Sequence, residues 1–82
     1  MNDVLYEHKN LGNKIRLYHN RLEIDRAGPF GKKESVLLRN VSKVELGFGR
    51  NMLIEMAGGS KVMVPIFGPA AEELKAKIMN LL

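Results

Sequence analysis

Three basic residues near the start of the chain, Lys9, Lys14 and Arg16, have a spacing that suits an anionic ligand. If Lys14 and Arg16 lie on one strand and Lys9 on the strand before it, the loop between them can hold clustered phosphates through charge-assisted hydrogen bonds. Lys32 and Lys33, in the next-but-one loop, would add positive charge to the same rim. These five residues are the candidate anion site, with the headgroups of an anionic lipid surface as the ligand class.

The same residues also fit a purely structural role. Polar and apolar residues alternate on both sides of His19-Asn20, which predicts a hairpin with a two-residue turn. The register of this hairpin places opposite charges face to face, Arg16 with Glu23 and Lys14 with Asp25. Such cross-strand pairs stabilise an exposed sheet face without any ligand. We therefore favour the structural role for Lys14 and Arg16 and keep lipid binding as an alternative.

Catalytic chemistry is not indicated. The only histidines are His8 and His19, and neither is accompanied by a pair of acidic residues or by metal-ligand spacing. Cysteine is absent, which excludes disulfides and thiolate nucleophiles. Gly58-Gly59 lacks the strand–glycine–helix context of a phosphate loop. We predict that the chain is not an enzyme and needs no cofactor or metal.

Length and composition are those of one small globular domain. The chain has 82 residues, 45% hydrophobic and 27% charged, which leaves room for a single core. A chain of this size buries only about 60–65% of its unfolded surface, so little stability remains for a deep active site. The net charge of +4 lies outside residues 68–82, whose charges cancel. No apolar run approaches the roughly 20 residues of a membrane span, and residues 1–9 do not resemble a signal peptide, so we expect a cytoplasmic protein.

Alternation of polar and apolar residues predicts seven short strands between about residues 4 and 66. They are expected at 4–8, 14–18, 21–25, 34–38, 41–48, 52–56 and 61–66. The turn at His19-Asn20 requires positive φ at both residues, which these residue types tolerate better than most. In the last hairpin, a three-residue loop would pair Glu55 with Lys61 on the outer face.

A helix is expected at about 69–81, because Gly68-Pro69 is typical of a helix start. Apolar residues recur there at helical spacing and form one stripe, made of Phe67, Ala71, Leu74, Ile78 and Leu81. A helix with a single apolar stripe would pack across the open end of a barrel of strands. The predicted fold is therefore mainly β, a seven-stranded antiparallel barrel or roll capped by a C-terminal amphipathic helix.

Seven antiparallel strands followed by one capping helix is the order of a pleckstrin-homology (PH) domain. Residues 14–26, the loop at 28–31, residues 35–46 and the helix at 69–82 resemble the short bacterial PH-like family. The resemblance covers nearly the whole chain and implies a single PH-like domain over residues 1–82. Lys9, Lys14 and Arg16 are similar to the basic pattern that some PH domains use for phosphoinositide headgroups. Some bacterial PH-like domains are similar to ring- or dimer-forming modules, which implies a homo-oligomer.

Protein binding needs no special residues, and several apolar positions are left over once one small core is filled. These candidates for an interface are Leu11, Phe30, Met52, Met63 and Leu82. The edge strands at 4–8 or 34–38 could also pair with a partner strand. Nucleic-acid binding is disfavoured because few aromatic residues remain to stack on bases. We predict a non-catalytic module that binds a protein or itself. The first alternative is binding to anionic lipid at the membrane periphery, and the second is weak nucleic-acid binding.

Overall fold

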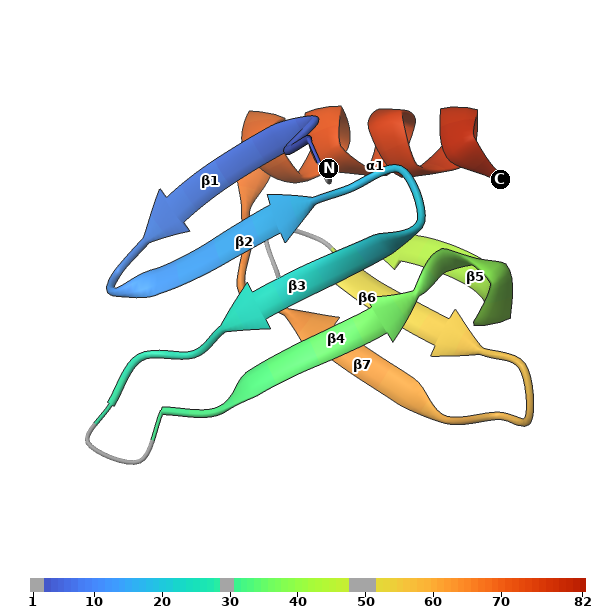
Figure 1. Ribbon diagram of the computed structural model, residues 1–82, viewed down its shortest axis with the longest axis horizontal. Helices are drawn as coiled ribbons and strands as arrows, with labels where there is room; N and C mark the ends of the chain where they lie inside the picture. The colour runs from blue at the N-terminus through green and yellow to red at the C-terminus, as the bar shows by residue number, and fades with distance from the viewer. Residues whose placement is uncertain (1–2, 29–30, 48–51) are drawn as a thin grey trace.

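The computed structural model describes residues 3–28, 31–47 and 52–82, and these residues form a mainly β structure (Figure 1). The first antiparallel sheet has the order β1 (Tyr6–Asn10), β2 (Asn13–Leu17), β3 (Arg21–Asp25) and β4 (Lys33–Leu37). The second consists of β5 (Val41–Leu46), β6 (Met52–Met56) and β7 (Lys61–Val64). The helix α1 (Gly68–Leu81) follows. The predicted seven strands and C-terminal helix are confirmed.

The hairpin of β2 and β3 has the predicted register. Ile15 lies opposite Ile24 and both are fully buried, whereas Arg16 lies opposite Glu23 on the outer face. The alternation determines this register, because a slip by one residue would turn both isoleucines to solvent and both charges into the core.

The tight turn with positive φ lies one hairpin earlier than predicted. His19 and Asn20 do not have positive φ, and the Asn20 carbonyl instead accepts a hydrogen bond from the Leu38 N–H at 3.0 Å. Between β1 and β2, Leu11 has φ of 50° and Gly12 has φ of 87°, the pair of left-handed residues that a two-residue hairpin requires. Because β1 runs into this turn, it covers residues 6–10 instead of the predicted 4–8.

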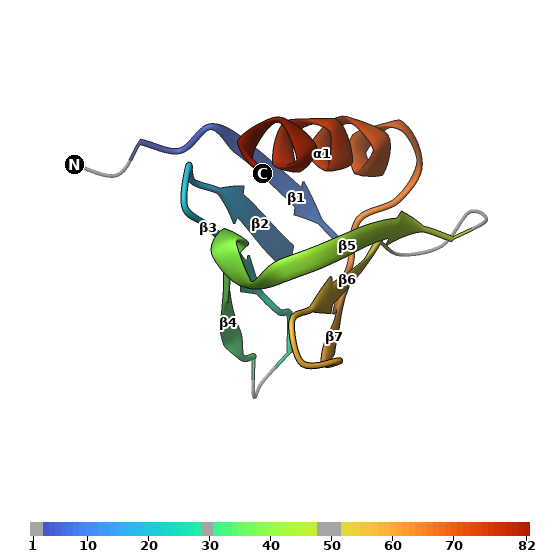
Figure 2. The ribbon, with the colours of Figure 1, turned by 90° about the vertical axis from the view of Figure 1, so that its right-hand side faces the viewer.

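The second sheet begins after a 3₁₀ corner at Leu38–Asn40 and runs crosswise to the first (Figure 2). Its last hairpin has the predicted register, with Glu55 opposite Lys61. Gly58 and Gly59 in the loop have φ of 96° and 95°, which explains why glycine occupies both positions.

The core lies between the two sheets and α1. It is made of apolar residues from both sheets, and the helix contributes Ala71, Leu74 and Ile78. Phe67 was expected on the same helical stripe but is 42% exposed. It precedes the helix in an extended conformation (φ −131°, ψ 159°), so helical spacing does not apply to it. The predicted stripe is therefore correct for its three central members only, since Leu81 is also partly exposed.

Candidate functional site

The register of the first sheet brings three of the five predicted basic residues into one row. Lys9 lies opposite Lys14, Lys14 opposite Asp25, and Asp25 opposite Lys33, so the row crosses all four strands. Lys32 directly precedes Lys33, and both are exposed. Lys9 and Lys14 face each other as like charges, which costs stability that a bound anion would recover. We call Lys9, Lys14, Asp25 and Lys33 the basic row.

Arg16, the remaining predicted anion ligand, lies one row further along and is already paired. Its Nε donates to Glu7 Oε2 at 2.9 Å, and this hydrogen bond lowers the pKa of Glu7 and raises the pKa of Arg16. The predicted partner, Glu23, instead accepts a hydrogen bond from Arg21 Nε at 2.9 Å. The register was right but the ion pair was wrong, and Arg16 is the one member of the candidate anion site that the structure shows paired with a carboxylate.

Leu11 stands at the tip of the β1–β2 hairpin, beside the basic row. It is 85% exposed, and its φ of 50° costs a non-glycine residue about 1 kcal/mol. The tip lies against the β3–β4 loop, since the Ala27 N–H donates to Asn13 Oδ1 at 2.8 Å. An exposed leucine flanked by Lys9 and Lys14 can enter a lipid surface while the lysines contact anionic headgroups.

The other predicted interface residues do not gather at one place. Met63, on β7, is 54% exposed. Met52 is fully buried opposite Val64, so its assignment to an interface was wrong. Phe30 lies outside the residues that the structure describes. Leu82 is exposed at the end of α1, where it lines a groove.

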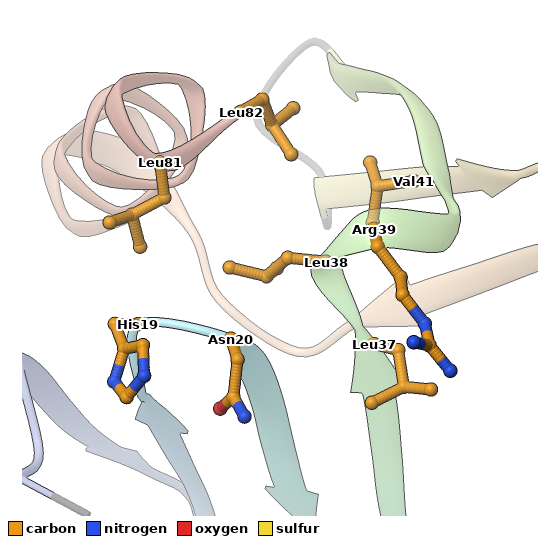
Figure 3. Close-up of a pocket in the computed structure, with 8 residues that line it drawn as sticks. All are labelled: His19, Asn20, Leu37, Leu38, Arg39, Val41, Leu81 and Leu82. Atoms are coloured by element: carbon orange, nitrogen blue, oxygen red, sulfur yellow. The ribbon is translucent and has the colours of Figure 1, made fainter.

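A groove of about 620 Å³ lies where the end of α1 faces the β2–β3 turn and the corner between β4 and β5 (Figure 3). It is lined by His19, Asn20, Leu37, Leu38, Arg39, Val41, Leu81 and Leu82, and we call it the end groove. Leu38 is almost fully buried and points into the space below the helix end. Leu81 and Leu82 extend toward Leu38 from the end of α1, so leucine side chains line the groove on the helix side and on the sheet side.

A smaller depression of about 270 Å³ shares Leu81 with the end groove. It is lined by Leu5, Leu17, Lys77, Asn80 and Leu81. The two linings together contain the cations Arg39 and Lys77 and, among the described residues, no carboxylate side chain. This surface therefore suits a partner that brings apolar groups together with negative charge.

Of the groove residues, sequence reasoning named only Leu82 as an apolar interface residue, although Leu37 and Leu38 lie in the predicted edge strand at 34–38. The groove joins residues 19–20, 37–41 and 81–82, which are far apart in the chain, so no local pattern marks it. A partial signal was present at Leu37: with Val36 and Leu38 facing inward, the alternation leaves this leucine on the outer face.

The two histidines lie in different surroundings. His8 stacks with Tyr6 at a ring-centroid distance of 6.5 Å, and His19 lies on the rim of the end groove beside Asn20. Burial raises the pKa of Tyr6, and the nearby carboxylate of Glu73 acts in the same direction. Among the described residues, no group of three or more His, Cys, Asp or Glu side chains could hold a metal ion.

No family model, curated protein or solved structure matches this chain. In the part of the chain that the structure describes, no helix has the length and apolar character needed to cross a membrane. The functional conclusion therefore depends on the geometry of the end groove and of the basic row.

Proposed function

We propose that this chain is a non-catalytic protein-binding module of PH-like fold, and that the end groove receives a partner protein or a second copy of the chain. Four strands, a corner, three strands and a C-terminal helix, in that order, support the PH-like assignment. The observation that carries the binding role is the gathering of exposed leucines around one hollow. Single exposed apolar residues are ordinary, whereas a contiguous apolar hollow is typical of a binding site.

A photo-crosslinking amino acid at position 82 tests this role in the cells that produce the protein. The matched control is the same amino acid at Met79, which is 52% exposed on α1 but lines neither depression. We expect a discrete adduct from position 82 and none from position 79. An adduct of doubled mass would identify a second copy, and another mass would identify a different protein. Equal labelling from the two positions, or none from either, would contradict the proposal.

Binding to an anionic membrane is the second candidate, and one specific observation favours it. Leu11 keeps an unfavourable backbone conformation at an exposed tip, next to a row in which Lys9 and Lys14 face each other. Each lysine near an anionic surface contributes about 1 kcal/mol, so Lys9, Lys14, Lys32 and Lys33 give only weak anchoring. Insertion of Leu11 would add about 1–2 kcal/mol.

Vesicle sedimentation separates this second role from the first. We expect binding to phosphatidylserine vesicles but not to phosphatidylcholine vesicles, weakened about fivefold by Lys14→Gln and further by salt. Leu11→Ser should weaken binding in the same assay, whereas Met79→Ser, at an exposed residue near the C-terminal end of α1, should not. Equal binding to neutral and anionic vesicles would exclude the role of the basic row.

A further inference from the structure

The free edges of β7 and β4 differ in whether other parts of the chain form hydrogen bonds with their backbone groups. An edge strand leaves every second backbone N–H and C=O without a ladder partner. At the start of the β6–β7 hairpin, the backbone N–H of Met56 donates to the Ser60 carbonyl, so the register turns the backbone groups of residues 61 and 63 in β7 to the free edge. The Met63 carbonyl there accepts a hydrogen bond from Arg26 at 2.8 Å. Pro65, which follows, has no N–H, and its carbonyl accepts from Asn10 Nδ2 at 3.3 Å. These two contacts therefore occupy the C-terminal end of the β7 edge.

The β4 edge is open. Arg26 N–H bonds Lys32 C=O and Leu38 N–H bonds Asn20 C=O, so the even-numbered residues of β4 face β3. The backbone of residues 33, 35 and 37 must therefore face away from the sheet. In the described part of the chain, no other element donates to or accepts from these three residues. Their side chains are exposed too, including Leu37 at 38%.

We propose that β4 binds an extended segment of a partner protein as an added antiparallel strand, and that this segment combines apolar with acidic residues. This inference rests on the proposed protein-binding function and adds the mode of binding. An added strand would satisfy the backbone groups of Lys33, Ser35 and Leu37, which is how extended peptides join exposed sheet edges. Antiparallel pairing is chosen because its ladder is slightly more stable for each residue.

Charge decides between a partner segment and a second copy of β4. Lys32 and Lys33 lie at the start of the edge and Arg39 just past its end, and all three are exposed. The one acidic residue of the strand, Glu34, already accepts a hydrogen bond from Arg26 at 2.6 Å. Two β4 strands paired antiparallel about Ser35 would bring Lys32 and Lys33 of each copy toward Arg39 of the other. That repulsion disfavours self-pairing, whereas carboxylates on a partner would turn it into attraction.

The register of an added strand specifies the partner's pattern. A residue opposite Leu37 lies on the same face and should be apolar, to cover a leucine that is partly exposed. Four positions later in an antiparallel segment, the residue opposite Lys33 should be acidic, and the next one would face Lys32. The small side chain of Ser35 places no demand on the residue between them. The expected pattern is apolar, three residues of free choice, then two acidic residues.

Ser35→Pro tests this inference without touching the native ladder. The Ser35 N–H points away from β3, so proline there removes a donor only from the free edge, where proline is tolerated. Ser35→Ala is the matched control, because it keeps the N–H. The probe is a fluorescent peptide with the central sequence Val-Val-Thr-Thr-Glu-Glu, and its control carries Lys-Lys in place of Glu-Glu. Binding is measured by fluorescence anisotropy at low and at high salt.

We expect the acidic peptide to bind the native chain, to bind Ser35→Ala equally, and to lose about tenfold or more in affinity for Ser35→Pro. The lysine peptide should bind far more weakly than the acidic one. Circular dichroism and urea unfolding of Ser35→Pro show whether its fold is intact. If that fold is lost, bulky Ser35→Trp, which keeps the N–H but crowds the added strand, replaces it with the same expectation. No binding to the native chain, or equal binding to the blocked edge, would overturn strand addition.

The outcome for the proposed function is read separately. If position 82 gave no crosslinked adduct but the acidic peptide bound normally, strand addition at β4 would be supported and partner binding at the end groove would be rejected. An adduct at position 82 in Ser35→Pro, with no peptide binding to the native chain, would do the reverse. A doubled solution mass without peptide, abolished by Ser35→Pro, would show that a second copy occupies β4 and would overturn the acidic partner.

Discussion

Replacing Leu74 by alanine should unfold this domain more readily than any change on the outer face of α1. Leu74 is fully buried and is one of the three helix residues that reach the core. Removing its apolar surface costs about 2–3 kcal/mol in transfer free energy, and the cavity left behind raises the total to about 3–4 kcal/mol. A domain of this length has a free energy of unfolding of only about 4–12 kcal/mol, so the loss is a large fraction of it.

Urea unfolding followed by far-ultraviolet circular dichroism measures this change directly. In thermal unfolding of the same variant, the expected fall in Tm is on the order of 20 °C, because small domains have a small entropy of unfolding. Met79→Ala is the control: Met79 lies on the same helix and is exposed, and alanine keeps the helix propensity, so the change should stay within about 0.5 kcal/mol. Equal losses in the two variants would refute the packing of α1 on the core through Leu74.

Three further perturbations test other parts of the molecule. Leu11→Asn should raise the free energy of unfolding by about 0.5–1 kcal/mol, because asparagine tolerates positive φ better than leucine; a decrease in urea unfolding would contradict the backbone geometry. The native chain should lose stability above about pH 10 as Tyr6 ionises, and Tyr6→Phe should lack this loss. The pKa of Tyr6 is raised in the folded state, so its contribution is present below about pH 10 and is lost as the pH rises through the folded value. Parallel stability curves for the native chain and Tyr6→Phe above pH 10 would rule this out. Arg26→Ala should cost about 1–2 kcal/mol, since it removes a partly exposed ion pair with Glu34 and the hydrogen bond to Met63. Arg26→Lys should recover part of that loss in thermal unfolding.

The strand pairings were predictable because two signals agreed. In β2–β3 and in β6–β7, alternation placed apolar residues on one face, and opposite charges such as Glu55 and Lys61 then faced each other. The same alternation should have placed Met52 in the core, because Met52 and Ile54 are two residues apart and share a face. That error came from counting leftover apolar residues instead of following the period of the strand.

Other features depend on tertiary structure and leave no local signal. Arg16 has two carboxylates within reach by register, Glu7 and Glu23, and the choice of Glu7 follows only once Arg21 is seen to hold Glu23. The hairpin turn at His19 gave a wrong φ prediction because a backbone bond from the β4–β5 corner supports it from outside the hairpin. The end groove also leaves no local signal in the sequence, because the residues that line it come together only when both sheets and the helix are in place.

Strand β4 runs from the basic row to the end groove. Substitutions along the basic row can therefore distinguish membrane binding from binding of a partner segment. The strand begins at Lys33, in the basic row, and ends at Leu37, on the end groove. A partner segment along β4 would use Lys33 for its carboxylates, and an anionic membrane would use the same lysine for its headgroups. The two ligands should therefore compete, although the surfaces lie toward opposite ends of the strand. Lys14→Gln should weaken vesicle binding and leave the acidic peptide unaffected, whereas Lys33→Gln should weaken both. If Lys33→Gln changed only one of them, that ligand alone would use the β4 end of the basic row.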